Sequence, residues 1–337
     1  MKLIKKQSIW ISDLTHTTQG SSSWTFPLGA SYVFSYAKQE LGSEFDIKLF
    51  KFPSSLDEAL CAHSPKMICF SNYSWNFELS YKFAFLAKQR DPSVITVFGG
   101  PNFPSDQNEK VEFLKKRPAI DFNIELEGEL GFVDLVKSLI GYNFNAATLK
   151  KQGKKIINTC YIYGDQLITG PLQRIRDINT IPSPYLTGAL DEFFNFPLVP
   201  LIETTRGCPF TCTFCVDGHD SSNKISRYDP ERVKEELYLI AKKVKNVDKI
   251  EITDLNFGMY KEDLVTAKAI ADIQRIYNYP ILIGASVGKN MPKRITEVTN
   301  MLNGLDMFAS LQSSDSIVLK AIKRSNISSK AYKEMIH

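Results

Sequence analysis

The sequence predicts an α/β protein in which a doubly wound parallel sheet is followed by a partial β/α barrel. Short apolar runs alternate with helical patterns up to about residue 140, as in parallel sheets with helices on both faces. Prolines then crowd residues 141–200, and the alternation returns from Leu201. We therefore expect a first domain at 1–140, a hairpin and Pro-rich connector at 141–200, and a second domain at 201–337.

The first domain is expected to alternate strands with helices, because its apolar runs are short and bounded by polar or turn-forming residues. The expected strands are Ser8–Leu14, Ile47–Phe52, Met67–Ser71, Val94–Gly99 and Phe122–Leu126. The expected helices are Leu28–Glu40, Leu56–Ala62, Phe77–Gln89, Val111–Lys115 and Phe132–Ile140. Ligands of such sheets bind beyond the carboxyl ends of the strands.

The connector is expected to begin with a hairpin, because Gly164 and Asp165 separate the apolar runs Ile156–Tyr163 and Gln166–Ile168. The prolines that follow mark a linking segment and not a core element. They are Pro171, Pro182, Pro184, Pro197 and Pro200.

The second domain resumes the β/α rhythm. Its expected strands are Leu201–Thr205, Lys249–Thr253, Ile281–Ala285 and Met307–Leu311. Its expected helices are Pro230–Val244, Lys261–Tyr277, Pro292–Leu302 and Ser316–Lys323. Only about four β/α units fit before His337, whereas a complete barrel has about eight. We therefore expect the barrel to be incomplete at its C-terminal end, as in part of a longer polypeptide.

Composition narrows the class of protein. Of the 337 residues, 43% are hydrophobic and 23% charged, which is ordinary for a globular protein and excludes a disordered or fibrous one. The net charge of +4 and the scattered lysine pairs indicate solvated surfaces and give no evidence for nucleic-acid binding. The apolar run Ile9–Ile11 is too short for a signal peptide, and no run approaches the ~20 residues of a membrane span. We expect a cytoplasmic location and no membrane partner.

Three of the six cysteines lie close together, at Cys208, Cys212 and Cys215, directly after the strand Leu201–Thr205. In a reducing compartment such crowding indicates metal binding, and thiolates suit iron–sulfur clusters or zinc. A closed site of either kind normally uses four protein ligands. Three thiolates would leave one iron of a cubane open, and a substrate or cofactor can coordinate there.

The spacing C-x3-C-x2-C with Phe214 before the last cysteine resembles the signature of the radical S-adenosylmethionine (SAM) superfamily. The resemblance implies a 4Fe-4S cluster whose open iron is chelated by SAM. Reductive cleavage of SAM would then yield methionine and a 5′-deoxyadenosyl radical, with Phe214 near the adenine. The alternative is a zinc site completed by His219, four residues beyond Cys215. The preceding strand, the Arg206-Gly207 lead-in and the aromatic position favour the cluster.

Other strand ends of the second domain carry polar residues that the resemblance places around SAM. Asp254 and Asn256 match acceptors for its amino group, although such residues also form helix caps and turns. Ser286 and Lys289 match contacts to its carboxylate, although a loop lysine is often only solvated. Gln312 and Ser313 match the glutamine–serine strand end that approaches SAM and substrate. Asp315 is expected to cap the helix that begins at Ser316. Arg324 belongs to a run that is often found after this strand in the family, and it is given no chemical role.

A parallel α/β domain ahead of such a barrel resembles the cobalamin-binding (class B) branch of the superfamily. Gly99 and Gly100 follow a buried strand, and the resemblance places this turn against the corrin and its nucleotide tail. Ser71 follows the preceding strand on the same rim, and Glu127-Gly128-Glu129 follows the later one. The alternative is a domain of the same fold that no longer binds a corrin.

The loop after the first strand departs from the branch's D-x-H-x-x-G pattern. His16 lies three residues after Asp13, one position farther than the pattern requires. A lone histidine in a polar loop more often makes hydrogen bonds than ligates a metal. The displacement therefore argues against cobalt ligation by His16. Many members of the branch lack this ligand, so cobalamin binding is still expected.

The resemblance covers essentially the whole chain and implies methyl transfer to an unactivated carbon or phosphorus of a small molecule. Methylcobalamin would supply the methyl group, and a reductase, flavodoxin or ferredoxin would supply electrons. Two alternatives remain open at this point. One is a non-methylating radical SAM enzyme that forms rings or rearranges its substrate. The other is an iron–sulfur electron carrier or a zinc-stabilised binding module.

Overall fold

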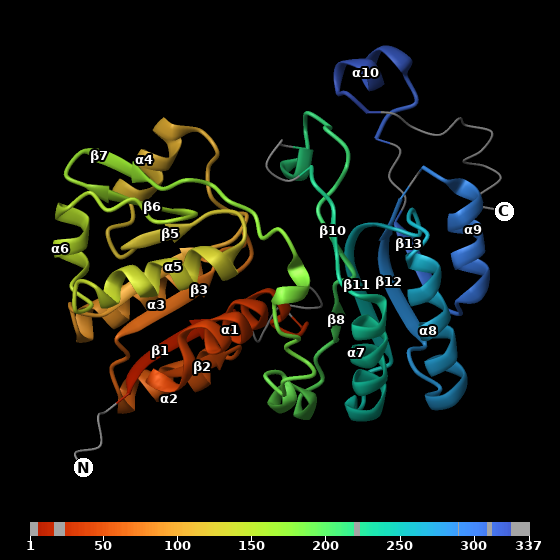
Figure 1. Ribbon diagram of the computed structural model, residues 1–337, viewed down its shortest axis with the longest axis horizontal. Coiled ribbons are helices and arrows are strands. Elements are labelled where there is room, and N and C mark those ends of the chain that lie inside the picture. Colours follow the sequence, from red (N-terminus) through yellow and green to blue (C-terminus); the bar gives the residue numbers. More distant parts are fainter. Residues whose placement is uncertain (1–5, 17–23, 219–222, 289, 309–311, 325–337) are drawn as a thin grey trace. The chain divides into compact units, whose positions relative to one another are not determined.

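The computed structural model describes residues 6–16, 24–218, 223–288, 290–308 and 312–324. The chain divides into two units, the first running to Ile175 and the second comprising Arg176 onward together with Trp24–Phe26. Each unit is built around its own parallel sheet (Figure 1). The expected α/β fold class is therefore confirmed.

The sheet of the first unit has the strand order β2-β1-β3-β4-β5-β6-β7. Its parallel strands are β1 (Gln7–Ser12), β2 (Phe45–Phe50), β3 (Met67–Ser71), β4 (Ile95–Gly99) and β5 (Phe122–Ile124). The side chains of Met67–Phe70 are all buried, as expected for a parallel strand covered on both faces. The carboxyl ends of the five parallel strands consequently share one edge of the sheet.

Helices cover both faces of this sheet. The helices are α1 (Leu28–Leu41), α2 (Pro53–Ala62), α3 (Phe77–Arg90), α4 (Gln107–Lys115), α5 (Gly128–Ile140) and α6 (Ala146–Lys151). One core joins Trp10 and Ile68 of the strands to side chains of α2, α3 and α4. Ile9 and Ile11 point to the opposite face, because side chains alternate along a strand. There α1 and α5 pack beside each other.

The expected hairpin forms, but it belongs to the sheet and not to a connector. Its strands β6 (Thr159–Tyr163) and β7 (Gln166–Thr169) are antiparallel, and β6 pairs with β5. The first unit therefore extends to Ile175, beyond the expected boundary at residue 140. The helix α6 was not expected, because its Lys-rich sequence shows little apolar periodicity. It begins where the Asn145 side chain accepts a hydrogen bond from the N–H of Thr148 (2.9 Å).

The second unit contains a parallel sheet with the order β13-β12-β11-β8. Its strands are β8 (Leu201–Ile202), β11 (Lys249–Phe257), β12 (Leu282–Val287) and β13 (Leu305–Phe308). A short antiparallel pair, β9 (Thr205–Arg206) and β10 (Ser226–Arg227), flanks the cysteine loop. The helices α7 (Pro230–Lys243), α8 (Asp263–Tyr277), α9 (Pro292–Met301) and α10 (Ser316–Ala321) follow in the expected order. The described strands and helices thus form the partial β/α barrel that the sequence predicts.

A short N-terminal segment, Trp24–Phe26, belongs to the second unit. Thr25 forms a parallel bridge with Val199, and the N–H of Phe26 donates to the Val199 carbonyl (3.0 Å). The Phe26 ring is 1% exposed and packs against Phe194 with ring centroids 4.9 Å apart. Tyr185 and Phe193 complete this aromatic cluster.

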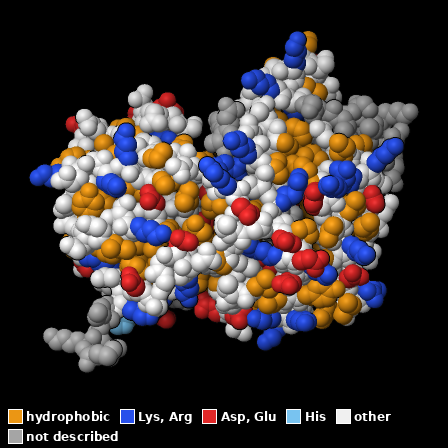
Figure 2. Space-filling model, viewed as in Figure 1, with side chains coloured by type: hydrophobic (Ala, Val, Ile, Leu, Met, Phe, Trp, Pro, Cys, Tyr) orange, Lys and Arg blue, Asp and Glu red, His pale blue; other side chains and the backbone are white. Residues whose placement is uncertain are grey.

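The surface carries mixed charge. On the face drawn in Figure 2, acidic and basic side chains of the described residues are interspersed with hydrophobic ones. Lys115, Lys116, Lys154 and Lys155 are exposed, as expected for solvated lysine pairs, whereas Lys150 is 17% exposed and its Nζ lies 3.0 Å from Asp121 Oδ1. Among the described residues, no helix combines the length and apolarity that crossing a bilayer requires.

Candidate functional site

The three cysteines occupy the loop between β9 and β10 in the second unit. Cys212 is 7% exposed, and the other two side chains are partly exposed. The loop is tightly wound: the Cys215 N–H donates to the Cys212 carbonyl (3.1 Å), and the Gly218 N–H donates to the Cys215 carbonyl (3.0 Å). A Cβ added at Gly218 would lie 2.2 Å from the Cys212 oxygen, so glycine is required there. The loop therefore presents the three thiols on one short, constrained segment.

Side chains distant in sequence reach two of these thiols. The Asn256 amide Nδ2, on β11, donates to Cys208 Sγ at 3.3 Å. The Arg324 Nη1, in the segment after α10, donates to Cys212 Sγ at 3.5 Å. The backbone of the same segment also joins the loop, because the Thr213 N–H donates to the Ile322 carbonyl (3.1 Å). The loop is thus held from β11 on one side and from the end of α10 on the other.

The donor set suits an iron–sulfur cluster. In a cubane each thiolate binds a different iron, so three ligands in one loop need not converge on one point. Within the described ranges, no three His, Cys, Asp or Glu side chains form a group that could hold a single metal ion. His219, the alternative zinc ligand, lies outside the described residues, and so does Lys289.

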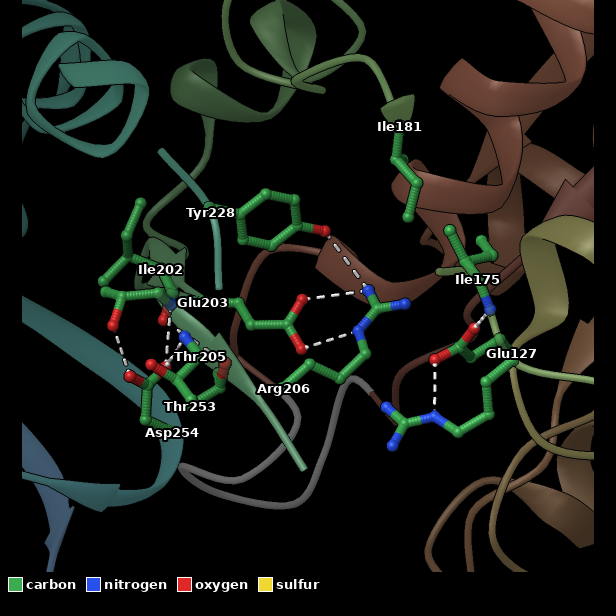
Figure 3. A network of polar contacts seen from close by, with 12 residues as sticks. Glu127, Ile175, Ile181, Ile202, Glu203, Thr205, Arg206, Tyr228, Thr253 and Asp254 are labelled. Atoms are coloured by element: carbon green, nitrogen blue, oxygen red, sulfur yellow. Dashed lines mark hydrogen bonds and ion pairs between the residues drawn. The ribbon is translucent and has the colours of Figure 1, made fainter. Parts of the chain in front are cut away.

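The Asp254 carboxylate forms a buried network with the chain that leads into the cysteine loop (Figure 3). It is 3% exposed and accepts from the N–H groups of Thr204 (2.8 Å) and Thr205 (3.1 Å), and from the Thr204 hydroxyl. Burial raises the pKa of the Asp254 carboxyl to about 7, although these hydrogen bonds lower it. Both carboxylate oxygens are thus used within the protein, so Asp254 positions the β8–β9 segment. The predicted contact with the SAM amino group remains a prediction.

Alternation along β11 explains why Asp254 and Asn256 lie together. Ile250, Ile252, Asp254 and Asn256 are buried and alternate with more exposed residues, and Phe257 at the end of the strand is buried as well. Polar residues therefore replace isoleucine on the buried face at the carboxyl end, where β/α barrels place their active sites. A register shift in the pairing of β11 with β12 falls in this stretch, and such irregularities redirect side chains.

Arg206 is fixed immediately before the cysteines. Its guanidinium binds both carboxylate oxygens of Glu203, at 3.0 and 2.9 Å, and donates to the Tyr228 hydroxyl at 3.3 Å (Figure 3). Two parallel charge-assisted hydrogen bonds fix the plane of the guanidinium. Arg206 therefore has a structural role: it ties the end of β9 to Glu203, which precedes this strand, and to Tyr228, which follows β10.

The other predicted SAM-binding residues are accessible. Phe214 is 51% exposed, Ser286 and Gln312 are exposed, and Ser313 is partly exposed. Gln312 has a positive φ of 67° and lies beyond β13, which ends at Phe308 and not at the expected Leu311. Asp315 caps α10 as predicted, because its carboxylate accepts from the N–H groups of Ile317 (2.7 Å) and Val318 (3.0 Å). The binding roles of the four accessible residues remain predictions.

In the first unit, a closed polar cluster lies at the carboxyl ends of β1, β2 and β3. The Lys51 Nζ lies 3.0 Å from Asp13 Oδ2, and the Ser71 hydroxyl donates to Asp13 Oδ1 at 2.5 Å. The Asn76 Nδ2 donates to Ser71 Oγ at 2.8 Å. Lys51 and Asn76 were not singled out from the sequence. Lys51 directly follows the second strand, as Asp13 follows the first, and that placement is the signal that could have identified the pair.

The buried Lys51–Asp13 pair is expected to stabilise the first unit. Lys51→Met should cost about 2 kcal/mol in the free energy of unfolding, because it leaves the 16%-exposed Asp13 carboxylate without its cation. Urea unfolding measures this loss. Lys48→Met is the matched control on β2, since its pair with Asp46 spans 3.9 Å and both side chains are half exposed. Equal losses in the two variants would contradict the importance of burial.

The turn after β4 is packed against the turn after β3. The Asn72 N–H donates to the Gly99 carbonyl (2.8 Å), and the Asn102 N–H donates to the Asn72 carbonyl (3.1 Å). Gly100 has φ +140°, and a Cβ there would lie 2.6 Å from the Asn72 oxygen. Ser71, Gly99 and Gly100 all remain partly exposed, so a ligand can reach this rim as predicted for a corrin.

The two glycines are expected to respond differently to substitution. Gly100→Ala should cost about 2 kcal/mol or more, because a residue with a side chain is strained at this φ and meets backbone. Gly99→Ala should be much milder, since its added Cβ would lie 3.5 Å from Ile124 in ordinary contact. Urea unfolding of the two variants provides the comparison. Similar losses of unfolding free energy in the two variants would show that contact with the Asn72 backbone is not the reason for a glycine at position 100.

Glu127 and His16, the other two residues considered for this rim, differ from each other in exposure. Glu127 is 7% exposed and binds the end of the first unit, accepting from Arg174 Nε (3.0 Å) and from the Ile175 N–H (Figure 3). Its carboxylate is thus used within the protein. His16 lies in the loop after β1 and is partly exposed.

The chain is similar to known proteins in both units. The B12-binding domain family matches residues 22–136. The chain is 30% identical to 2-(S-pantetheinyl)-carbapenam-3-carboxylate methyltransferase of Streptantibioticus cattleyicolor over 325 residues, which cover 92% of this chain and 46% of that protein. It is 28% identical to the cobalamin-dependent radical SAM methyltransferase TokK of Streptomyces tokunonensis, with the same coverage of both chains.

A solved structure has the same fold. The cobalamin-dependent SAM radical enzyme OxsB, with aqua-cobalamin and SAM bound, matches with a TM-score of 0.72 and 17% identity. The match covers 98% of this chain and 47% of OxsB. The chain thus spans about half the length of the relatives that it matches.

Proposed function

Because this chain belongs to the cobalamin-binding radical SAM superfamily, we propose that it acts in methyl transfer from cobalamin to an unactivated carbon or phosphorus of a small molecule. A B12-binding unit and a C-x3-C-x2-C loop in one chain are the observation that carries the proposal. The relatives named as methyltransferases match both units and favour methyl transfer over ring formation.

In the second unit, Cys208, Cys212 and Cys215 would hold a 4Fe-4S cluster. Phe214 would lie along the adenine of SAM, and Ser286 would contact its carboxylate. Gln312 and Ser313 would line the path to the substrate. These four side chains are exposed or partly exposed, as contact with a bound molecule requires.

In the first unit, Ser71, Gly99 and Gly100 would border a corrin. When bound, the cluster and SAM supply a 5′-deoxyadenosyl radical, and cobalamin supplies the methyl group. The protein's contribution would be to fix the loops that receive these groups. The Asp13–Lys51–Ser71 contacts fix the loop after β3, and the Asp254–Thr204 contacts fix the approach to the cysteines.

We further propose a cytoplasmic enzyme that receives single electrons from a reduced flavodoxin or ferredoxin. A reducing compartment keeps closely spaced cysteines as thiols that are available to iron. The same compartment contains such low-potential carriers.

The direct test is anaerobic reconstitution of the chain with iron, sulfide and hydroxocobalamin, followed by desalting and addition of dithionite and SAM. We expect visible absorbance from both cluster and corrin, and 5′-deoxyadenosine by mass spectrometry. With substrate present, S-adenosylhomocysteine should accompany a methylated product. Stoichiometric zinc without cluster absorbance would refute the proposal. Retained cluster without retained corrin would remove its cobalamin part.

A further inference from the structure

We propose that Asn256 and Arg324 raise the reduction potential of the cluster by donating hydrogen bonds to two of its cysteine ligands. The inference rests on the proposed function, because it requires a cluster at the three cysteines. It differs from the prediction made for Asn256, which placed this side chain at the SAM amino group. It also gives Arg324 a role, where the sequence alone assigned none.

Asn256 is placed to act on Cys208. Its Nδ2 lies 3.3 Å from Cys208 Sγ, within hydrogen-bonding range for sulfur, and the side chain is only 9% exposed. Its position on the buried face of β11 fixes its direction, since Asp254 two residues earlier is anchored to Thr204. An amide held in this way can donate without rearrangement when charge develops on the sulfur.

Arg324 is placed to act on Cys212. Its Nη1 lies 3.5 Å from Cys212 Sγ, and its guanidinium carbon lies 5.8 Å from the centroid of the Phe214 ring. The Thr213–Ile322 backbone hydrogen bond holds the segment that carries it. Because a guanidinium remains charged in proteins, Arg324 adds a positive charge as well as a donor at the most buried of the three thiols.

Cys215 has a different environment. Its backbone N–H donates to the Cys212 carbonyl, and its carbonyl accepts from Gly218. These contacts shape the loop and do not involve the sulfur. Within the described part of the chain, side chains from distant segments donate to the sulfurs of Cys208 and Cys212.

Hydrogen bonds to ligand sulfurs are among the factors that set iron–sulfur potentials. Reduction adds one electron, here from reduced flavodoxin or dithionite, and the cluster changes from the 2+ to the 1+ state without forming or breaking a bond. The added negative charge is shared with the sulfurs, so a donor or cation there stabilises the reduced state more than the oxidised one. The effect is greater in a partly buried site, where the dielectric is low.

The test is a potentiometric titration of the reconstituted full chain, followed by electron paramagnetic resonance of the 1+ cluster. In Asn256→Leu, which keeps the side-chain size, the equilibrium constant for reduction should fall about tenfold, equivalent to about 59 mV for one electron. Arg324→Gln should lower this equilibrium constant by at least as much. Arg324→Lys keeps the positive charge, so its equilibrium constant should lie between those of Arg324→Gln and the parent protein. Thr253→Val is the control on β11, because it removes only a hydrogen bond to the Ile202 carbonyl (3.2 Å).

Iron content is measured on every variant before titration, and the two positions test the idea independently because they lie on different segments. An unchanged potential at full iron content in Asn256→Leu and Arg324→Gln would overturn the inference. An equal fall in Thr253→Val would overturn it too, because the effect would then be a general loosening of β11. A parent protein that forms no cluster would instead refute the proposed function.

Discussion

Replacing Cys212 by alanine is expected to abolish cluster assembly and to reduce 5′-deoxyadenosine formation below detection. Cys212 is the most buried of the three thiols and the centre of the loop, since its carbonyl accepts from Cys215 and its sulfur from Arg324. With two thiolates left, the cluster would lack a ligand for a second iron. Iron content, visible absorbance and mass spectrometry of the reaction with SAM measure the loss.

The matched control for Cys212→Ala is Cys61→Ala. Cys61 is an exposed thiol on α2 in the first unit, so its removal should leave iron content and 5′-deoxyadenosine unchanged. Full cluster absorbance in Cys212→Ala would contradict the assignment of this ligand. If zinc were bound instead and were lost in a His219→Ala variant, the alternative zinc site would be supported.

Replacing Asp254 by alanine is expected to destabilise the second unit by about 4 kcal/mol. Three buried donors from Thr204 and Thr205 would lose their acceptor, and each such group costs about 1–3 kcal/mol. Asp254→Asn should be much milder, because its amide oxygen can accept from both N–H groups. Hydrogen exchange of the Thr204 and Thr205 amides, together with urea unfolding, measures the difference. Equal exchange in the two variants would contradict this account.

The same carboxyl should make stability depend on pH. Burial raises the pKa of Asp254 to about 7 in the folded protein, above its ordinary value of 3.8, so the folded state binds this proton more tightly than the unfolded state. The resulting stability is fully present below about pH 4 and is lost as the pH rises through about 7. The decline in unfolding free energy with pH should therefore be weaker in Asp254→Asn than in the parent protein.

The order of the elements could be predicted because it depends on local patterns. The run Met67–Ser71 is a strand with the expected bounds, and α3 and α7 begin at the expected residues. Asp315 caps α10 because an aspartate before a helix accepts from nearby N–H groups in most contexts. The three cysteines lie within eight consecutive residues, so they share one loop regardless of how the rest of the chain folds.

What could not be predicted depends on partners that are distant in the sequence. The hairpin after Asn158 looks the same whether it stands alone or extends a sheet, and only the pairing of β6 with β5 decides this. Asp254 and Asn256 were expected to face a ligand. The contacts that they make within the protein, to Thr204 and Cys208, are set by how β11 lies beside the β8–β9 segment. The Lys51–Asp13 pair arises in the same way, from neighbouring strands whose ends meet.

The aromatic cluster around Phe26 bears on how this gene could be divided. Sequence order places Trp24–Phe26 among residues of the first unit, yet Phe26 fills a pocket formed by Tyr185, Phe193 and Phe194 of the second. A fragment starting at Arg176 would carry that pocket empty, with a cavity the size of a benzyl group. No single cut therefore yields two whole domains. Producing the second unit on its own would therefore require Trp24–Phe26 to be supplied with it.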